Sequence, residues 1–289
     1  MRRFDLVEPR SMSEACALLA HDSDAKAVAG GTALLTIIKQ GLLLPKLLVN
    51  LKKIHDGSAI TFDPVQGLRI GALATINEIE TSQIVIRNYR ALAEACHVVA
   101  NIRIRNMATI GGNLAHGDYQ SDPPTVLAAL DARLELLSAG KVRQLALTDF
   151  QLGSYETVLQ PGELLAAVVI PPLPPGMNGN YVKFTTGSSG ERPCAGVAAL
   201  ARFERGICHE LRLAVGAVSA KPLRIAAAEL ATGKALSVEL IATIAAAAAR
   251  TIDPIDDVRG PAEYKRHLVG VMTRRALQTL ANGQSERKS

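Results

Sequence analysis

Tryptophan is absent from this chain of 289 residues, and aromatic residues make up only 3% of it. Hydrophobic residues still make up 48%, so the chain can bury a core, which must consist mainly of Ala, Leu, Val and Ile. The net charge of +5 is scattered along the chain. A nucleic-acid surface would interleave basic and aromatic side chains, so we expect no nucleic-acid partner.

No two cysteines form the C-x-x-C pairs that zinc and iron–sulfur sites use. We therefore expect no metal site in this chain. The wide spacing of the cysteines in a protein of this size favours reduced thiols and a cytoplasmic location. The four residues are Cys16, Cys96, Cys194 and Cys208.

Long apolar runs are also missing. The longest, residues 241–249, falls far below the ~20 residues that a membrane-spanning helix needs. Asp5, Glu8 and Glu14 interrupt any signal-peptide core near the N-terminus. The sequence therefore predicts no membrane span.

The first half of the chain predicts strands and helices in alternation. Short apolar runs predict strands at residues 25–29, 47–51, 68–71, 133–138 and 164–170. Helical patterns cover residues 32–40 and 89–99, and Thr75 with Glu78 fits a capping box. Asp122 before Pro123 predicts another helix start, with Asp122 as the N-cap.

A cluster of four prolines at residues 171–175, followed by Gly176, predicts the domain boundary. Beyond it we expect strands at 181–186, 195–203 and 207–218, the last two joined by a hairpin turn at 204–206. Helices are expected at 221–232, 238–250 and 261–281.

Two Gly-Gly loops carry the chemistry. Glycine admits positive φ, and successive backbone N–H groups can then form a concave nest for phosphate. The first loop precedes a predicted helix, and the second is predicted as a polar turn whose Thr109 and Asn113 can bond phosphate oxygens. Neither loop fits G-x-G-x-x-G or the P-loop, and either alone is more often a structural turn. Two such loops indicate a ligand with two phosphates, a dinucleotide. They comprise Ala29, Gly30, Gly31, Thr32 and Ala33, and Thr109, Ile110, Gly111, Gly112 and Asn113.

The amino-acid sequences of these loops resemble those of a known family. Residues 108–115 read Ala-Thr-Ile-Gly-Gly-Asn-Leu-Ala, and Ser121-Asp122 with a Pro-rich helix start follows. This resembles the FAD-binding medium subunit of molybdenum hydroxylases, the carbon monoxide dehydrogenase and xanthine dehydrogenase family. Ala-Gly-Gly-Thr at 29–32 is similar to its other flavin loop, and residues 101–106, 181–184 and 259–266 are similar to further family segments.

The resemblance implies an α+β fold. Residues 1–176 would form an FAD-binding domain of the vanillyl-alcohol-oxidase and cell-wall-precursor-reductase type, with subdomains at about 1–55 and 56–176. Residues 177–289 would form a C-terminal domain with an antiparallel sheet and helices. The FAD would lie extended between the two subdomains.

The resemblance also implies FAD contacts at both loops and at Asp122, Leu165 and Lys183. Asp122 could bond a flavin-side hydroxyl or only cap its helix. Leu165 could offer its backbone or only fill the core, and Lys183 could favour the reduced flavin or be a solvated lysine. Ala33 stands where many relatives carry a polar residue, and Thr32 replaces the His of some relatives, so the FAD should be non-covalent.

The implied function is that of an oxidoreductase subunit that transfers electrons. A molybdenum-cofactor large subunit and an iron–sulfur small subunit with 2Fe–2S clusters would pass electrons to this FAD, and the FAD would pass them to an external acceptor. The resemblance implies a dimer of heterotrimers and no catalytic residue in this chain. The alternative is a self-sufficient FAD-dependent oxidase or reductase of the same fold, which needs an acid or base beside the flavin, and the C-terminal region offers only His209 and Glu210.

Overall fold

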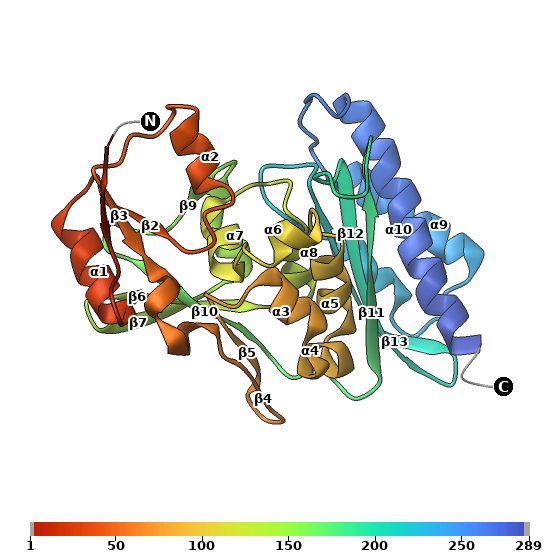
Figure 1. Ribbon diagram of the computed structural model, residues 1–289. Coiled ribbons are helices and arrows are strands. Elements are labelled where there is room, and N and C mark those ends of the chain that lie inside the picture. The colour runs from red at the N-terminus through yellow and green to blue at the C-terminus, as the bar shows by residue number, and fades with distance from the viewer. Residues whose placement is uncertain (1–2, 286–289) are drawn as a thin grey trace.

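The computed structural model describes residues 3–285, so residues 1–2 and 286–289 of the expected domains lie outside the described part. The N-terminal part is a parallel sheet in the order β1-β3-β2 (Figure 1). Its strands are β1 (Asp5–Val7), β2 (Lys26–Val28) and β3 (Leu47–Asn50). Helix α1 (Met12–His21) packs on this sheet, and α2 (Leu34–Lys39) follows the first glycine loop.

The middle part is an antiparallel sheet in the order β4-β5-β10-β6-β7. Its central strand β10 follows all the α-helices of this part in the sequence. The strands are β4 (Ile60–Asp63), β5 (Gly67–Gly71), β6 (Arg133–Ser138), β7 (Lys141–Ala146) and β10 (Leu164–Ile170). Ile70 of β5 lies opposite Val168 of β10, and both side chains are fully buried.

The helices of the middle part lie between this sheet and the C-terminal sheet (Figure 1). They are α3 (Ile76–Thr81), α4 (Gln83–Asn88), α5 (Arg90–His97), α6 (Ile102–Arg105), α7 (Ile110–His116) and α8 (Asp122–Ala129). All eight residues of α8 are buried. Short elements complete this part: 3-10 turns η1 (Leu51–Lys53), η2 (His55–Ser58) and η3 (Leu147–Asp149), and the hairpin of β8 (Gln151–Gly153) and β9 (Glu156–Thr157).

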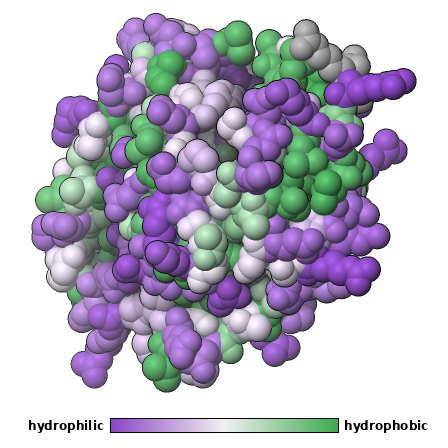
Figure 2. Space-filling model, turned by 90° about the vertical axis from the view of Figure 1, so that its left-hand side faces the viewer, coloured by the Kyte–Doolittle hydropathy of each residue, from purple (hydrophilic) through white to green (hydrophobic). Residues whose placement is uncertain are grey.

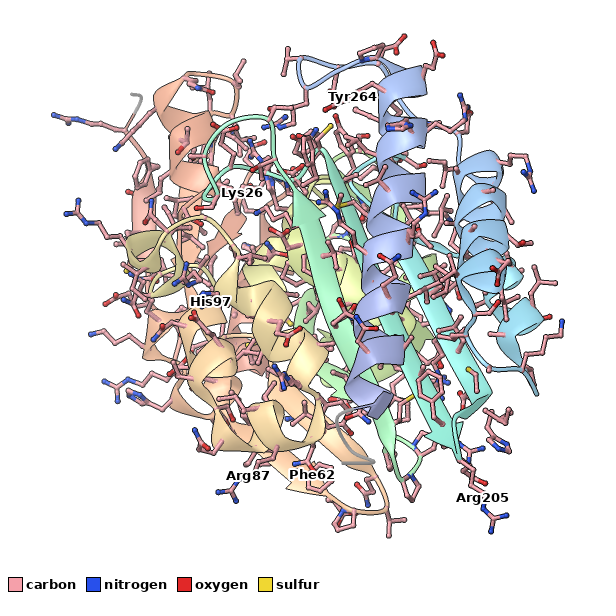
Figure 3. All side chains as sticks on the ribbon, turned by 90° about the vertical axis from the view of Figure 1, so that its right-hand side faces the viewer. Lys26, Phe62, Arg87, His97, Arg205 and Tyr264 are labelled. Atoms are coloured by element: carbon pink, nitrogen blue, oxygen red, sulfur yellow. The ribbon has the colours of Figure 1, made fainter. Side chains whose placement is uncertain are left out.

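The C-terminal sheet is antiparallel, in the order β11-β12-β13-β14. Its strands are β11 (Met177–Phe184), β12 (Ala195–Glu204), β13 (Ile207–Gly216) and β14 (Leu223–Arg224). Helix α10 (Ala262–Ser285) crosses one face of the sheet with α9 (Val238–Thr251) beside it, as Figure 3 shows. Helices α5 and α8 cover the other face. Cover on both faces explains why β12 reads as a continuous apolar run, since a strand buried on both sides has no polar face.

Most surface on the side of α1 is hydrophilic, with smaller hydrophobic groups among the polar ones (Figure 2). Within residues 3–285 no helix is long and apolar enough to cross a membrane. The domain boundary at Gly176 stays a prediction: β11 begins at the next residue, yet Ala198, Leu200 and Ala214 of the C-terminal sheet share one buried cluster with the middle part.

Three sequence predictions are wrong in detail. Residues 221–232 do not form one helix, because Arg224 pairs with Ala214 at the edge of the C-terminal sheet and the rest forms a 3-10 turn, η4 (Ala226–Ala231). Helix α8 begins at Asp122 itself, with Ser121 as the N-cap. Gly111 and Gly112 lie in the first turn of α7 and not in a polar turn. Strands β1, β4 and β7, which are short or largely exposed, and helix α1 were not expected from the sequence.

Two glycines face each other inside the C-terminal sheet. Gly196 of β12 pairs with Gly216 of β13. A Cβ on Gly216 would overlap the hydroxyl of Thr125 on α8, and a Cβ on Gly196 would overlap the hydroxyl of Tyr181 on β11. The missing side chains therefore make room for polar groups between the sheet and α8.

We predict that Gly216→Ala lowers the free energy of unfolding by about 1–3 kcal/mol, because the added methyl overpacks a tight site. Gly270→Ala in α10 is the control, since its Cβ would meet nothing closer than 3.7 Å. Alanine at position 270 should stabilise the protein by about 0.5–1 kcal/mol, because it lowers the conformational entropy of the unfolded chain. Urea unfolding measures both, and equal effects of the two variants would contradict the packing argument.

Candidate functional site

The first glycine loop offers a row of free backbone donors. The N–H groups of Gly30, Gly31, Thr32 and Ala33 donate to no protein group among the described residues. Gly31 adopts a φ of +72°, the left-handed conformation that lets successive N–H groups converge. We call these four N–H groups the amide nest. Its geometry suits an anion such as a phosphate.

The second glycine loop uses its donors internally. The Gly111 N–H donates to the Ala72 carbonyl at 2.8 Å, and the Gly112 N–H donates to the Thr109 hydroxyl at 3.1 Å. The Ile110 N–H donates to the Ala74 carbonyl at 2.9 Å. Two backbone carbonyls and the Thr109 hydroxyl thus accept these three hydrogens, so this loop does not offer the free backbone donors that the sequence suggests. The Thr109 hydroxyl hydrogen remains available to a ligand.

The two loops touch each other. A Cβ on Gly30 would overlap the carbonyl oxygen of Met107, two residues before Thr109. Only glycine permits this approach, which brings together segments almost 80 positions apart in the sequence. Gly111 packs equally tightly, since its Cβ would lie 2.6 Å from the Ala72 Cβ. Gly112 is the open glycine of the pair, because only the Thr109 hydroxyl, at 3.0 Å, would meet its Cβ.

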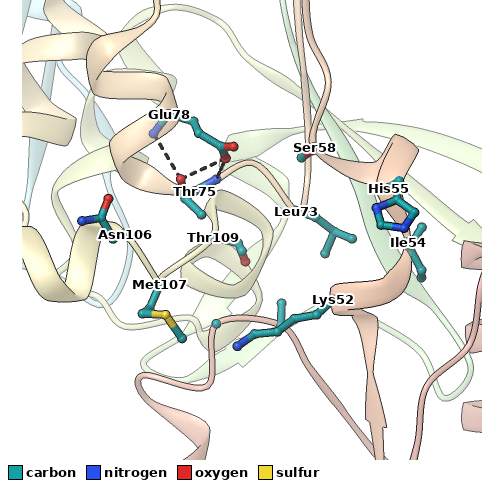
Figure 4. Close-up of a pocket in the computed structure, with 12 residues that line it drawn as sticks. Lys52, Ile54, His55, Ser58, Leu73, Thr75, Glu78, Asn106, Met107 and Thr109 are labelled. Atoms are coloured by element: carbon teal, nitrogen blue, oxygen red, sulfur yellow. Dashed lines mark hydrogen bonds between the residues drawn. The ribbon is translucent and has the colours of Figure 1, made fainter.

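A cavity of about 220 Å³ lies between the two loops and the 3-10 turns η1 and η2 (Figure 4). This is smaller than the ~300–1,000 Å³ of pockets that enclose a whole small ligand, so it suits part of a dinucleotide. Its lining includes Ala29, Gly30 and Thr109 from the predicted loops. The other lining residues were not expected from the sequence: Lys52, Ile54, His55, Ser58, Leu73, Thr75, Glu78, Asn106 and Met107.

Glu78 is the one carboxylate in this lining. Its Oε2 accepts from the Thr75 N–H at 2.7 Å and from the Thr75 hydroxyl at 2.9 Å, drawn as dashed lines in Figure 4. This is the capping box that the sequence predicts at the start of α3. The carboxylate is thereby held by its own helix start.

Asp122 and Lys183 form a separate buried cluster that does not line this cavity. The Lys183 ammonium lies 3.1 Å from Asp122 Oδ2 and donates to the Val98 carbonyl at 2.8 Å. The Tyr181 hydroxyl, which the sequence analysis missed, donates to Asp122 Oδ1 at 2.9 Å. Both charged side chains are only 6% exposed, so Lys183 is not a solvated lysine.

Burial raises the pKa of the Asp122 carboxyl to about 6, although Lys183 and the Tyr181 hydrogen bond act in the opposite direction. The cluster holds Val98 at the end of α5, and the chain runs from there through α6 to the second glycine loop. It thus supports the segment that carries Met107 and Thr109.

The remaining predicted residues lie close by or in the core. Asn113 lies in α7, and its Oδ1 accepts from the Ser121 hydroxyl at 2.7 Å. Leu165 is 5% exposed in β10, next to a register shift in the sheet. Glu210 of the alternative oxidase site is paired with Arg212 at 2.7 Å, and His209 lies 3.6 Å from Glu204. Within the described chain no group of three His, Cys, Asp or Glu side chains could hold a metal ion.

Two known families match successive parts of the chain. Residues 2–173 match the family described as FAD binding domain in molybdopterin dehydrogenase. Residues 182–280 match the CO dehydrogenase flavoprotein C-terminal domain.

Individual relatives match over nearly the whole chain. The chain is 34% identical to a carbon monoxide dehydrogenase medium chain of Afipia carboxidovorans, covering 95% of this chain and 96% of that one. It is 33% identical to a 6-hydroxypseudooxynicotine dehydrogenase complex subunit alpha of Paenarthrobacter nicotinovorans, covering 95% and 93%. The solved quinoline 2-oxidoreductase of Pseudomonas putida 86 superposes with a TM-score of 0.93 at 30% identity, covering 98% of both chains.

The glycines of the second loop should respond differently to substitution. We predict that Gly112→Ala weakens FAD binding while the free energy of unfolding stays within about 1 kcal/mol of native, the helix propensity of Ala being favourable. Gly111→Ala should instead destabilise the fold by about 1–3 kcal/mol, because its methyl meets Ala72. Flavin titration and urea unfolding separate the two effects, and normal FAD binding by Gly112→Ala would place the ligand elsewhere.

The buried pair predicts a pH-dependent stability. Because the pKa of Asp122 is raised to about 6, the folded protein holds this proton more tightly than the unfolded chain. The contribution of Asp122 to the free energy of unfolding is then greatest below about pH 4 and falls as the pH rises to about 6. Lys183→Met should raise this pKa further and extend the fall to higher pH.

Near pH 8, Lys183→Met should cost about 3–5 kcal/mol, because it leaves a buried charge unpaired. The cost should be smaller near pH 5, where Asp122 is protonated. Arg90→Met removes an exposed pair with Glu94 and should cost only about 0.3–0.5 kcal/mol at either pH. Urea unfolding at both pH values measures the difference, and a loss from Lys183→Met that is the same at both would contradict the raised pKa.

Proposed function

Because this chain belongs to the FAD-binding subunits of the molybdenum hydroxylases, we propose that its first glycine loop binds the pyrophosphate of FAD. The observation that carries this is the amide nest. Four successive N–H groups have no protein acceptor among the described residues, and the first of them, on Gly30, belongs to the lining of the cavity between the two loops. Unmade hydrogen bonds of this kind are costly unless water or a ligand accepts them, and a phosphate accepts several at once.

The second loop would contribute an open surface and one side-chain donor, but no backbone donors. Gly112 leaves its surface open, and the Thr109 hydroxyl can still donate its hydrogen. In the first loop, Thr32 and Ala33 would each donate a backbone N–H group to the pyrophosphate, and Ala33 would make no side-chain hydrogen bond. The FAD is non-covalent in this proposal, because Thr32 offers no imidazole for a covalent link.

Bound FAD supplies one- and two-electron transfer, and the protein supplies position. The Asp122–Lys183 pair and Tyr181 would keep the segment from Val98 to Thr109 in place. Leu165 would contact the cofactor through its backbone at the irregular point of β10. We assign no catalytic acid or base to this chain. The candidates for the oxidase alternative, His209 and Glu210, do not line the cavity, and Glu210 is paired with Arg212.

We further propose the partners of this subunit. The names of the relatives above describe medium chains and complex subunits. A large subunit with the molybdenum cofactor would oxidise the substrate, and a small subunit with 2Fe–2S clusters would carry the electrons to FAD. The assembly would be a dimer of heterotrimers in the cytoplasm, and the FAD would deliver electrons to an external acceptor.

We expect that the chain expressed alone oxidises no organic substrate, whereas co-expression with molybdenum and iron–sulfur subunits gives turnover. The reason is that this chain would provide only the FAD site, whereas the oxidation of the substrate would take place at the molybdenum cofactor of the large subunit. The measurement is reduction of an artificial acceptor with heterocycles, aldehydes and carbon monoxide as substrates. Acid precipitation of the complex should release all of its flavin as FAD.

Robust turnover by the chain alone would favour the self-sufficient oxidase instead. Flavin that stays with the precipitated protein would contradict the non-covalent site. The purified complex should contain molybdenum and iron, and removing this chain should abolish electron transfer to the acceptor but not reduction of the iron–sulfur clusters.

A further inference from the structure

Lys52 lies in the 3-10 turn η1, directly after the central strand of the N-terminal sheet. Its neighbours Leu51 and Ile54 are 6% and 2% exposed and fix the turn in the core. The Asn50 side chain caps the turn by accepting from the Lys52 N–H at 3.3 Å. With its backbone held in this way, Lys52 extends its side chain into the cavity, and its nitrogen lies on the side of Met107 (Figure 4).

The Lys52 ammonium has no hydrogen bond or ion pair with any described residue. Its neighbour Lys53 lies 3.3 Å from Glu8, and Lys46 lies 2.9 Å from Asp24. Glu78, the carboxylate of the cavity lining, is held by Thr75. An unpaired cation therefore lines the same cavity as the first glycine loop.

We propose that Lys52 is a pyrophosphate-binding residue, whose ammonium pairs with the diphosphate of the dinucleotide across the cavity from the amide nest. This inference rests on the proposed function. The nest supplies directional N–H donors without a net charge, and Lys52 supplies the positive charge that a diphosphate requires. Lysine serves phosphate in this way as a mobile point charge at the end of a flexible side chain.

Two properties follow from a partly solvated charge pair. Loss of the ammonium should weaken FAD binding about tenfold, the scale of one such pair, and the weakening should shrink as salt screens the charges. Arginine at this position should keep most of the affinity, because it keeps the charge.

The test is the dissociation constant of FAD for the deflavinated complex that contains this chain, measured by quenching of flavin fluorescence at low and high salt. Lys52→Met, Lys52→Arg and the matched control Lys53→Met are compared with the native protein. Lys53 has the same charge one position away but is already paired with Glu8. The thermal unfolding temperature of each deflavinated variant checks that the fold is unchanged.

We expect about tenfold weaker binding for Lys52→Met at low salt, a smaller difference at high salt, and near-native binding for Lys52→Arg and Lys53→Met. Native affinity in Lys52→Met overturns the inference and leaves the proposed function standing. Equal losses in Lys52→Met and Lys53→Met also overturn it, since they would indicate only the general surface charge. Failure of the native complex to bind FAD overturns the proposed function and this inference together.

Discussion

The approach of Gly30 to the carbonyl of Met107 is the contact on which the site depends. It joins the N-terminal sheet to the segment that leads into α7, and no side chain fits between them. The contact sets one loop against the other, so that Gly30 of the amide nest and Thr109 line one cavity. A methyl group at position 30 would push the loops apart and would widen the site that they form.

The two glycine loops are alike in sequence and differ in what they offer. In the first, the left-handed Gly31 turns the backbone so that four N–H groups remain free. In the second, Ala72 and Ala74 have already accepted the hydrogens of Gly111 and Ile110. The motif that resembles the family more specifically thus has its backbone donors occupied by protein acceptors, and the weaker motif keeps its donors free. A motif can be specific because tight packing limits which residues fit at its positions, just as contact with a ligand does.

Most of the expected strands and helices form because they depend on local patterns, whereas the α+β fold is implied by the family resemblance. Gly-Gly pairs, the Thr75 capping box and the apolar run of β12 can each be recognised without knowing their neighbours. Lys52 could not be found in this way, since one lysine beside another carries no signal. Its position in the cavity follows from the turn that Leu51 and Ile54 anchor, and its freedom follows from the pairing of Lys53 with Glu8. The same holds for residues 221–232. Their sequence has a helical pattern, but Leu223 and Arg224 pair with the edge of β13 instead.

The buried cluster around Asp122 shows how the C-terminal part bears on a site that it does not line. Tyr181 and Lys183 come from β11, Asp122 comes from α8, and the Val98 carbonyl lies at the end of α5. Gly196 and Gly216 lack side chains where Tyr181 and Thr125 need room, so the sheet is shaped to accept this cluster. Because a buried carboxylate and ammonium are costly to separate, the pair fixes how the C-terminal sheet sits against α8. The position of the second loop is therefore set from two sides, by Gly30 at one end and by this ion pair at the other.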